Sequence, residues 1–158
     1  MGKYHSRWKA GCIVGGYLIC QLMLCVSLEA ASPQLRTLSP RGGQRGTDVT
    51  VSIYGQRLGD AKQIMFYSEG FTVSDLEIQN DKKIKVKLTI APDCRLGEHS
   101  LRIRTESGIS ELQTFWVSQF PNKEEEESNN FFDEAQPIQL NVTVNGRIDK
   151  EDVDYFIL

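Results

Sequence analysis

The chain of 158 residues carries 18 basic and 21 acidic side chains and has a formal net charge of −3. Residues 1–30 hold three of the basic residues and one acidic residue, Glu29, so residues 31–158 carry 15 basic (18 − 3) and 20 acidic (21 − 1) side chains. This acidic excess argues against a nucleic-acid binder, because such proteins present a basic surface to phosphates. The length that remains is enough for one full domain and a fragment of a second.

The N-terminal segment, residues 1–30, has the layout of a helical signal peptide for secretion. A basic start precedes an apolar stretch, residues 10–26, and small residues, Ala30 and Ala31, follow it; this is the order of regions in a secretory signal. The apolar stretch is also close to the length of a bilayer-spanning helix, so an uncleaved N-terminal anchor is the alternative. Polar residues and Pro33 come next and favour cleavage. We expect a protein that is secreted or held in the periplasm or cell envelope, with membrane contact only through this segment if it stays uncleaved.

Only one cysteine, Cys94, lies outside this segment, because Cys12, Cys20 and Cys25 all fall within it. Cys94 therefore has no partner for an intrachain disulfide. Two interpretations stay open: a small buried apolar side chain near a turn, and a nucleophile activated by His99. A nucleophile of this kind needs a further group that orients the histidine, and the sequence shows no such group. We favour the first.

Short alternating runs of apolar and polar residues fill the stretch from residue 33 to residue 120. Period-two patterning predicts antiparallel strands that bury one face and expose the other. Turn residues, glycine above all, separate the runs. Runs at this spacing predict a β-sandwich over residues 33–120. The apolar positions on one face of these strands are Val49, Val51, Ile53, Ile84, Val86, Leu88, Ile90, Leu101 and Ile103.

One predicted strand changes parity along its length. Phe71 and Val73 occupy odd positions, whereas Leu76 and Ile78 occupy even ones. A straight strand cannot place both pairs on one face, because side chains alternate strictly. The pattern therefore predicts a β-bulge near Ser74–Asp75.

A short loop over residues 80–82 would return the chain with Ile78 opposite Ile84. That register places Glu77 opposite Lys85, so the row of lysines on the next strand gains carboxylate neighbours. We interpret the lysine row as a solvated, partly neutralised strand face rather than an anion site.

Three aromatic side chains, Tyr54, Tyr67 and Trp116, are candidates for stacking on sugar rings if they are exposed. The alternative for the last of them is burial, and we expect either Trp116 or its neighbour Phe115 to fill the sandwich core.

The first predicted domain resembles immunoglobulin-like modules of the IPT/TIG type, which begin with a proline, a glycine-rich turn and a strand. The resemblance covers roughly residues 33–117 and implies an immunoglobulin-like antiparallel β-sandwich that acts as a spacer, dimerisation unit or binding platform. The residues that match the outline are Pro40, Gly43, Gly46, Thr47, Val49, Val51, Gly55 and Leu58.

The stretch FPNKEEEESNN changes the composition abruptly. Glu124–Glu127 are four consecutive like charges, and such a run predicts a solvated acidic linker over residues 121–131. Consecutive side chains do not converge without a folded loop, so we do not expect this run to bind calcium.

The chain closes on an acidic cluster, Asp149, Glu151, Asp152 and Asp154, followed by the apolar run Tyr155–Leu158. The spacing does not fit an EF-hand loop, and a catalytic carboxylate pair would need a cleft. We interpret the cluster as a polar turn that leads into a strand. Calcium at Asp152 and Asp154 is the alternative, and we expect no other metal or cofactor.

Residues 132–158, with the end of the linker, resemble the start of the bacterial pre-peptidase C-terminal domain. The resemblance implies an incomplete second β-sandwich in a secreted bacterial protein whose chain continues beyond Leu158. The matching residues are Glu127, Asn129, Asn130, Ala135, Ile138, Leu140, Gly146, Ile148, Asp152, Asp154, Tyr155 and Phe156.

Residues 31–158 contain one histidine and neither an HExxH nor a GxSxG motif, so no set of nucleophile, base and orienting group is recognisable. We expect no enzyme activity, and a non-catalytic extracytoplasmic module for binding, adhesion or spacing in a larger secreted bacterial protein. Its partner would be a protein or polysaccharide at the cell surface, and not nucleic acid. The alternative is the accessory region of a secreted hydrolase, such as a peptidase, whose catalytic domain lies downstream of residue 158.

Overall fold

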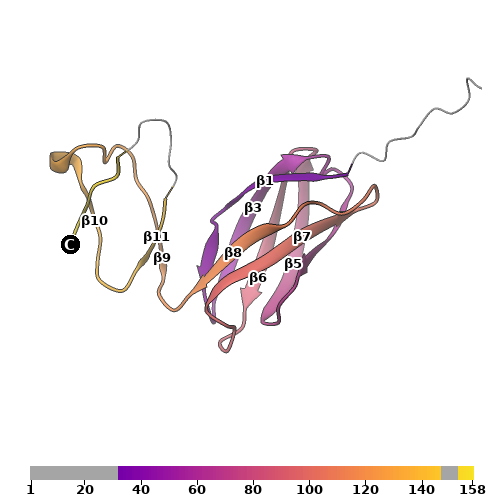
Figure 1. The fold of residues 1–158 in the computed structure, drawn as a ribbon, viewed down its shortest axis with the longest axis horizontal. Helices are drawn as coiled ribbons and strands as arrows, with labels where there is room; N and C mark the ends of the chain where they lie inside the picture. Colours follow the sequence, from indigo (N-terminus) through magenta and orange to yellow (C-terminus); the bar gives the residue numbers. More distant parts are fainter. Residues whose placement is uncertain (1–31, 147–152) are drawn as a thin grey trace, which may run out of the picture. The chain divides into compact units, whose positions relative to one another are not determined.

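The computed structural model describes residues 32–146 and 153–158 (Figure 1). The expected signal peptide lies outside the described residues, as do Asp149, Glu151 and Asp152 of the C-terminal cluster. Within the part of the chain that is described, no helix is long and apolar enough to cross a membrane. Residues 31–158 form one compact unit built almost entirely from strands.

Two four-stranded sheets form the first part of this unit. The first sheet has the order β1-β3-β6-β5 and the second the order β2-β8-β7-β4. All neighbours are antiparallel except β2 and β8, which are parallel. The strands are β1 (Gln34–Ser39), β2 (Gly42–Gln44), β3 (Asp48–Gln56), β4 (Ala61–Phe66), β5 (Phe71–Asn80), β6 (Lys83–Ile90), β7 (Gly97–Thr105) and β8 (Gln113–Ser118).

This strand order is that of an immunoglobulin constant-type sandwich, with the first strand divided so that its second half joins the other sheet. The all-β, immunoglobulin-like prediction is therefore confirmed. The division occurs over residues 40–41, where the chain leaves β1 in one sheet and begins β2 in the other.

The core lies between the inner faces of the two sheets, where alternate residues of each strand are buried. β6 shows the rule most clearly: Ile84, Val86, Leu88 and Ile90 are at most 1% exposed. Phe115 from β8 is fully buried and meets the rings of Phe66 and Phe71 edge to face, at centroid distances of 6.2 and 6.1 Å. Burial of one such ring contributes roughly 1.5–3 kcal/mol.

The period of two that buries Phe115 turns its neighbour Trp116 outward, and Trp116 is 54% exposed. Of the two candidates for the core, Phe115 is thus the one that fills it.

The predicted bulge in β5 is confirmed. The pairing of β5 with β6 shifts between Ser74 and Glu77, and Asp75 has a positive φ of 51°. Ile78 lies opposite Ile84 and Glu77 opposite Lys85, as the register predicts. Ile78 is nevertheless 44% exposed, because β5 is the edge strand of its sheet and has a neighbour on one side only.

The lysine row on β6 is neutralised in part by a residue that the sequence pattern does not reveal. Lys87 Nζ lies 2.8 Å from Asp48 Oδ2 on β3, and Thr89 Oγ1 donates a hydrogen bond to the same carboxylate at 2.7 Å. These hydrogen bonds lower the pKa of Asp48, and the carboxylate raises the pKa of Lys87. The row is a solvated strand face on which Lys87 is paired with Asp48.

The second part of the unit, residues 121–158, consists of short elements. β9 (Asn122–Glu124) pairs in parallel with β11 (Thr143–Asn145), and β10 (Gln136–Pro137) pairs in parallel with β12 (Phe156–Ile157). A single 3-10 turn, η1 (Phe132–Glu134), precedes β10. Part of the stretch expected as a linker, residues 121–131, therefore has strand pairing through β9.

Gly70 lies between β4 and β5 with a φ of +98°, and a Cβ atom built on it would lie 2.7 Å from Cys94 Sγ. We predict that Gly70→Ala lowers the free energy of unfolding by roughly 1–3 kcal/mol, because alanine is strained in this backbone conformation and meets a buried neighbour. Urea unfolding measures the difference.

Gly59→Ala is the control, because the nearest atom to a built Cβ is Asp81 Oδ1 of an exposed side chain at 3.3 Å. We expect a change below about 1 kcal/mol. Equal losses for the two variants would contradict the assignment of strain to Gly70.

Candidate functional site

Three carboxylates from two separate segments converge in the second part of the unit. One oxygen each of Glu125, Glu127 and Asp154 lies within 4.8 Å of the other two. Glu125 and Asp154 are half-buried and Glu127 is exposed. In an extended backbone, residues i and i+2 project to the same side, and this alternation brings Glu125 and Glu127 together.

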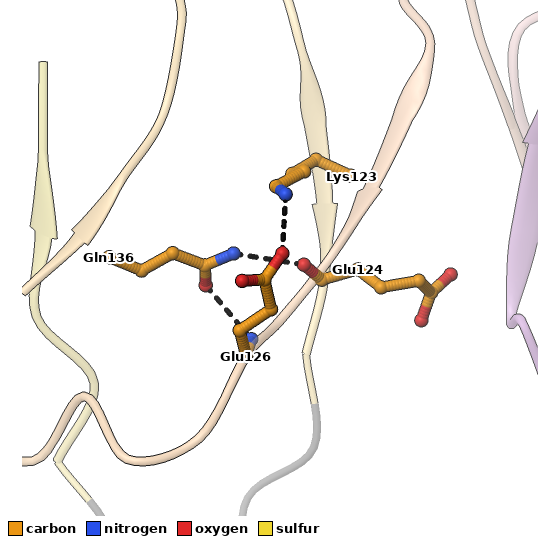
Figure 2. Close-up of polar contacts among 4 residues, drawn as sticks. All are labelled: Lys123, Glu124, Glu126 and Gln136. Carbon is orange, nitrogen blue, oxygen red and sulfur yellow. Dashed lines mark hydrogen bonds and ion pairs between the residues drawn. The ribbon is translucent and has the colours of Figure 1, made fainter.

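The side-chain amide of Gln136 holds the backbone on both sides of Glu125 (Figure 2). Its Nε2 donates to the carbonyl of Glu124 at 3.0 Å, and its Oε1 accepts from the backbone N–H of Glu126 at 3.1 Å. Gln136 is only 4% exposed. The amide thus takes the place of a neighbouring strand and keeps this segment extended.

The glutamate between the two converging ones points elsewhere. Glu126 forms an ion pair with Lys123, and Figure 2 shows this contact above the Gln136 bonds. The two side chains are 68% and 43% exposed, so the pair contributes at most about 1 kcal/mol. Glu126 is therefore a natural comparison for its two neighbours.

Backbone hydrogen bonds bring Asp154 to the glutamates. The N–H of Tyr155 donates to the carbonyl of Asn129, and the N–H of Gln136 donates to the carbonyl of Tyr155, each at 2.9 Å. Asn129, two residues after the end of the acidic run, is thereby tied to Tyr155, the residue that follows Asp154. Strand pairing between β10 and β12 continues the same connection.

Asn129 lies beside the cluster and is 0% exposed. Its Nδ2 donates to Glu125 Oε1 at 3.3 Å, and its Oδ1 has no hydrogen-bond partner among the described residues. A buried amide oxygen without a partner costs about 1–3 kcal/mol. Which end of an amide is oxygen is assigned from the hydrogen-bond network, and a reversed amide would present Oδ1 to the carboxylates as a further ligand.

The group offers only oxygen atoms. Carboxylates with an amide carbonyl suit a hard cation such as Ca²⁺, whereas zinc sites are typically built from cysteine and histidine. Sequence reasoning identified Asp154 as a calcium candidate and paired it with Asp152, which lies outside the described residues. It assigned Glu125 and Glu127 to a solvated run. The signal that could have found them is their i, i+2 spacing.

Cys94 and His99 lie close together, with 4.0 Å between Sγ and Nε2. Ser68 Oγ contacts His99 Nδ1 at 2.6 Å and is a third group that the sequence did not reveal. His99 Nε2 lies 2.6 Å from the carbonyl oxygen of Arg95. Because a carbonyl can only accept, Nε2 carries the hydrogen and cannot take the thiol proton.

Burial raises the pKa of the Cys94 thiol, and the residue is 3% exposed. A raised pKa and a base with its proton in place are the opposite of what a nucleophile needs. The Cys94–His99 pair is part of the packed interior, next to Phe71, whose ring meets the imidazole edge to face at 4.9 Å.

Comparisons with known proteins return no matching family model and no matching curated protein. Solved structures similar to part of the chain include a Bacteroides ovatus protein, SGBP-B of a mixed-linkage glucan utilization locus, in complex with a mixed-linkage heptasaccharide. It is 16% identical with a TM-score of 0.41, over 60% of this chain and 24% of that one. SGBP-B from a complex xyloglucan utilization locus in Bacteroides uniformis is 24% identical with a TM-score of 0.36, over 54% of this chain and 23% of that one.

The filamin domain of Lin-41 is 10% identical with a TM-score of 0.39, over 52% of this chain and 91% of that domain. This chain spans about a quarter of the length of the two Bacteroides proteins. The strand order described above, rather than these likenesses, establishes the immunoglobulin-like sandwich, and the binding partners of those proteins are not carried over to this chain.

We predict that the Cys94 thiol reacts slowly in the folded protein. In a chain with Cys12, Cys20 and Cys25 replaced by serine, Cys94 is the single thiol. Its reaction with Ellman's reagent at pH 8 is expected to be at least about 100-fold slower in buffer than in denaturing urea, because the thiol is buried and protonated. A fast reaction of the folded protein would restore the nucleophile interpretation.

Proposed function

We propose that residues 31–158 are a non-catalytic extracytoplasmic module of a larger secreted bacterial protein, and that calcium fixes its second part. The sandwich serves as a platform, and residues 121–158 carry the cation site. The partner of the module is a protein or polysaccharide at the cell surface. The same module would serve as the accessory region of a secreted hydrolase, and neither role requires catalysis by these residues.

The observation that carries the proposal is the convergence of Glu125, Glu127 and Asp154 around a buried amide, Asn129, whose oxygen has no partner among the described residues. Carboxylates that lie this close repel one another when all are ionised, and a divalent cation removes that repulsion. With its amide reversed, Asn129 would offer Oδ1 to the cation as a neutral ligand in place of the Nδ2 contact with Glu125.

Calcium fits better than magnesium. Ca²⁺ accepts six to eight oxygen ligands in flexible geometry, whereas Mg²⁺ demands a near-ideal octahedron and releases its waters reluctantly. Glu127 is exposed, so water can complete the shell of the larger ion. Extracellular modules bind calcium with dissociation constants of about 10⁻⁴–10⁻³ M, and we expect a value in that range.

We predict that calcium binds with a measurable heat in isothermal titration and stabilises the protein against unfolding. At ten times the dissociation constant, the expected stabilisation is about 1.4 kcal/mol. Glu127→Gln and Asp154→Asn each remove one carboxylate ligand, and each is expected to weaken binding at least about tenfold.

Glu126→Gln is the matched control, because it removes the same charge from the residue between the two glutamates that converge. We expect it to leave the affinity within about twofold, since Glu126 pairs with Lys123. Titration without heat, or equal weakening by all three variants, would overturn the calcium assignment. Equal weakening would mean that the affinity for calcium depends only on the net charge of the segment.

Gln136→Ala tests the positioning of Glu125 and touches no proposed ligand atom. Loss of its two hydrogen bonds to the backbone is expected to weaken calcium binding about tenfold and to speed amide hydrogen exchange at Glu126, whose N–H loses its partner. Gln139→Ala, at an exposed glutamine on the same segment, is expected to change neither. Faster exchange with unchanged affinity would limit Gln136 to a purely structural role.

A further inference from the structure

Two adjoining hollows line one edge of the sandwich, and both include Arg41, Asn145 and Gly146. The larger has a volume of about 670 Å³ and reaches Tyr54 on β3. The smaller has a volume of about 240 Å³ and reaches Trp116 on β8. Together they form a groove, the Arg41 groove, with an aromatic side chain in each of its two lobes.

Trp116 is uncovered because of its cross-strand neighbour. It lies opposite Gly42 on β2, which has no side chain to pack on the indole. A Cβ atom at position 42 would lie 2.5 Å from the carbonyl oxygen of Trp116 and 3.2 Å from its Cβ, so only glycine fits there. More than half of the Trp116 side chain is exposed as a result.

Hydrogen bonds fix the walls of the groove. Asn145 Oδ1 accepts from the backbone N–H of Arg41 at 3.2 Å, and its Nδ2 donates to Glu124 Oε2 at 2.8 Å. Asn122 Nδ2 donates to the carbonyl of Gly42 at 2.8 Å. Walls that are already held in place lose little entropy when a ligand binds.

Arg41 supplies donors that are not otherwise used. Its guanidinium makes no hydrogen bond or ion pair with any residue of the described ranges, and the side chain is exposed. A guanidinium can donate to two neighbouring hydroxyl groups at once. The groove thus combines aromatic faces with free donors, a combination typical of sites for ligands that are apolar on one side and polar at the edge.

We propose that the Arg41 groove binds a neutral oligosaccharide, with one pyranose ring stacked on Trp116 and hydroxyl groups hydrogen-bonded to Arg41. This inference rests on the proposed function, because it names the surface polysaccharide as the partner and its place on the module. The carboxylate of Glu98 lies on the strand next to Trp116, and that of Glu124 is bonded to Asn145. Counted together with the Arg41 guanidinium, these two carboxylates leave the neighbourhood of the groove without a net positive charge, which favours a neutral chain over uronic acids.

Trp116 itself reports on binding, because the chain has two tryptophans, Trp8 and Trp116, and Trp8→Phe leaves only the second. Fluorescence titration of that chain uses cellohexaose, xylohexaose and maltohexaose as neutral probes and hexagalacturonate as the acidic one. We expect a saturable change with at least one neutral hexasaccharide and none with hexagalacturonate.

Calorimetry on variants locates the site. Trp116→Ala is expected to weaken binding about tenfold or more, and Arg41→Gln to weaken it by a smaller factor. Tyr67→Ala is the matched control, because Tyr67 is 63% exposed and lies outside both hollows, and it should leave the affinity within about twofold.

The proposal is overturned if no neutral hexasaccharide binds, if hexagalacturonate binds preferentially, or if Trp116→Ala and Tyr67→Ala have equal effects. Binding of a surface protein that depends on Trp116, with all sugars inactive, would also overturn it and assign the groove to a protein. Asp154→Asn separates this outcome from a failure of the calcium assignment: the variant should lose calcium binding and keep sugar binding, since Asp154 does not line the groove.

Discussion

The packing of the two sheets around Phe115 is the constraint on which the rest of the sandwich depends. Alternate residues of every inner strand must face this ring and its neighbours, because side chains along a strand point to opposite faces in turn. The residues between them are then directed to the outer faces of the sheets. The lysines of β6 face water because Ile84, Val86, Leu88 and Ile90 face the core, and Trp116 is exposed because Phe115 is buried. The same rule that builds the core therefore supplies the surface on which a ligand could bind.

The alternation of side chains along an extended backbone also determines which residues converge in the second part of the unit, residues 121–158. Residues 124–126 are held extended by one buried glutamine, which bonds to the backbone as a strand would. Extended geometry sends Glu125 and Glu127 to one side and Glu126 to the other. The four glutamates therefore have different neighbours: Glu125 and Glu127 join Asp154 in the carboxylate cluster, Glu126 pairs with Lys123, and Glu124 is bonded to Asn145.

The proposed calcium site and the Arg41 groove differ in chemistry but lie close together in the chain. Glu124 is bonded to Asn145 in the wall of the groove, while the next residue, Glu125, belongs to the carboxylate cluster. The first part of the unit and the second meet at β2, β8, β9 and β11, where Asn122 bonds Gly42 and Thr143 bonds Ser118. The two sites share a segment of the chain but no side chain.

The sequence by itself determined the strands of the sandwich, the bulge near Ser74–Asp75 and the register of Ile78 with Ile84, because each follows from the parity of neighbouring residues. It narrowed the core aromatic to Phe115 or Trp116 and could not choose between them, since the choice depends on which face of β8 meets the other sheet. Only the tertiary structure decided the contacts between distant segments: Asp48 with Lys87, Ser68 with His99, and Asp154 with Glu125 and Glu127. Such contacts depend on how strands are placed in three dimensions, and the periodicity of a single strand carries no information about that placement.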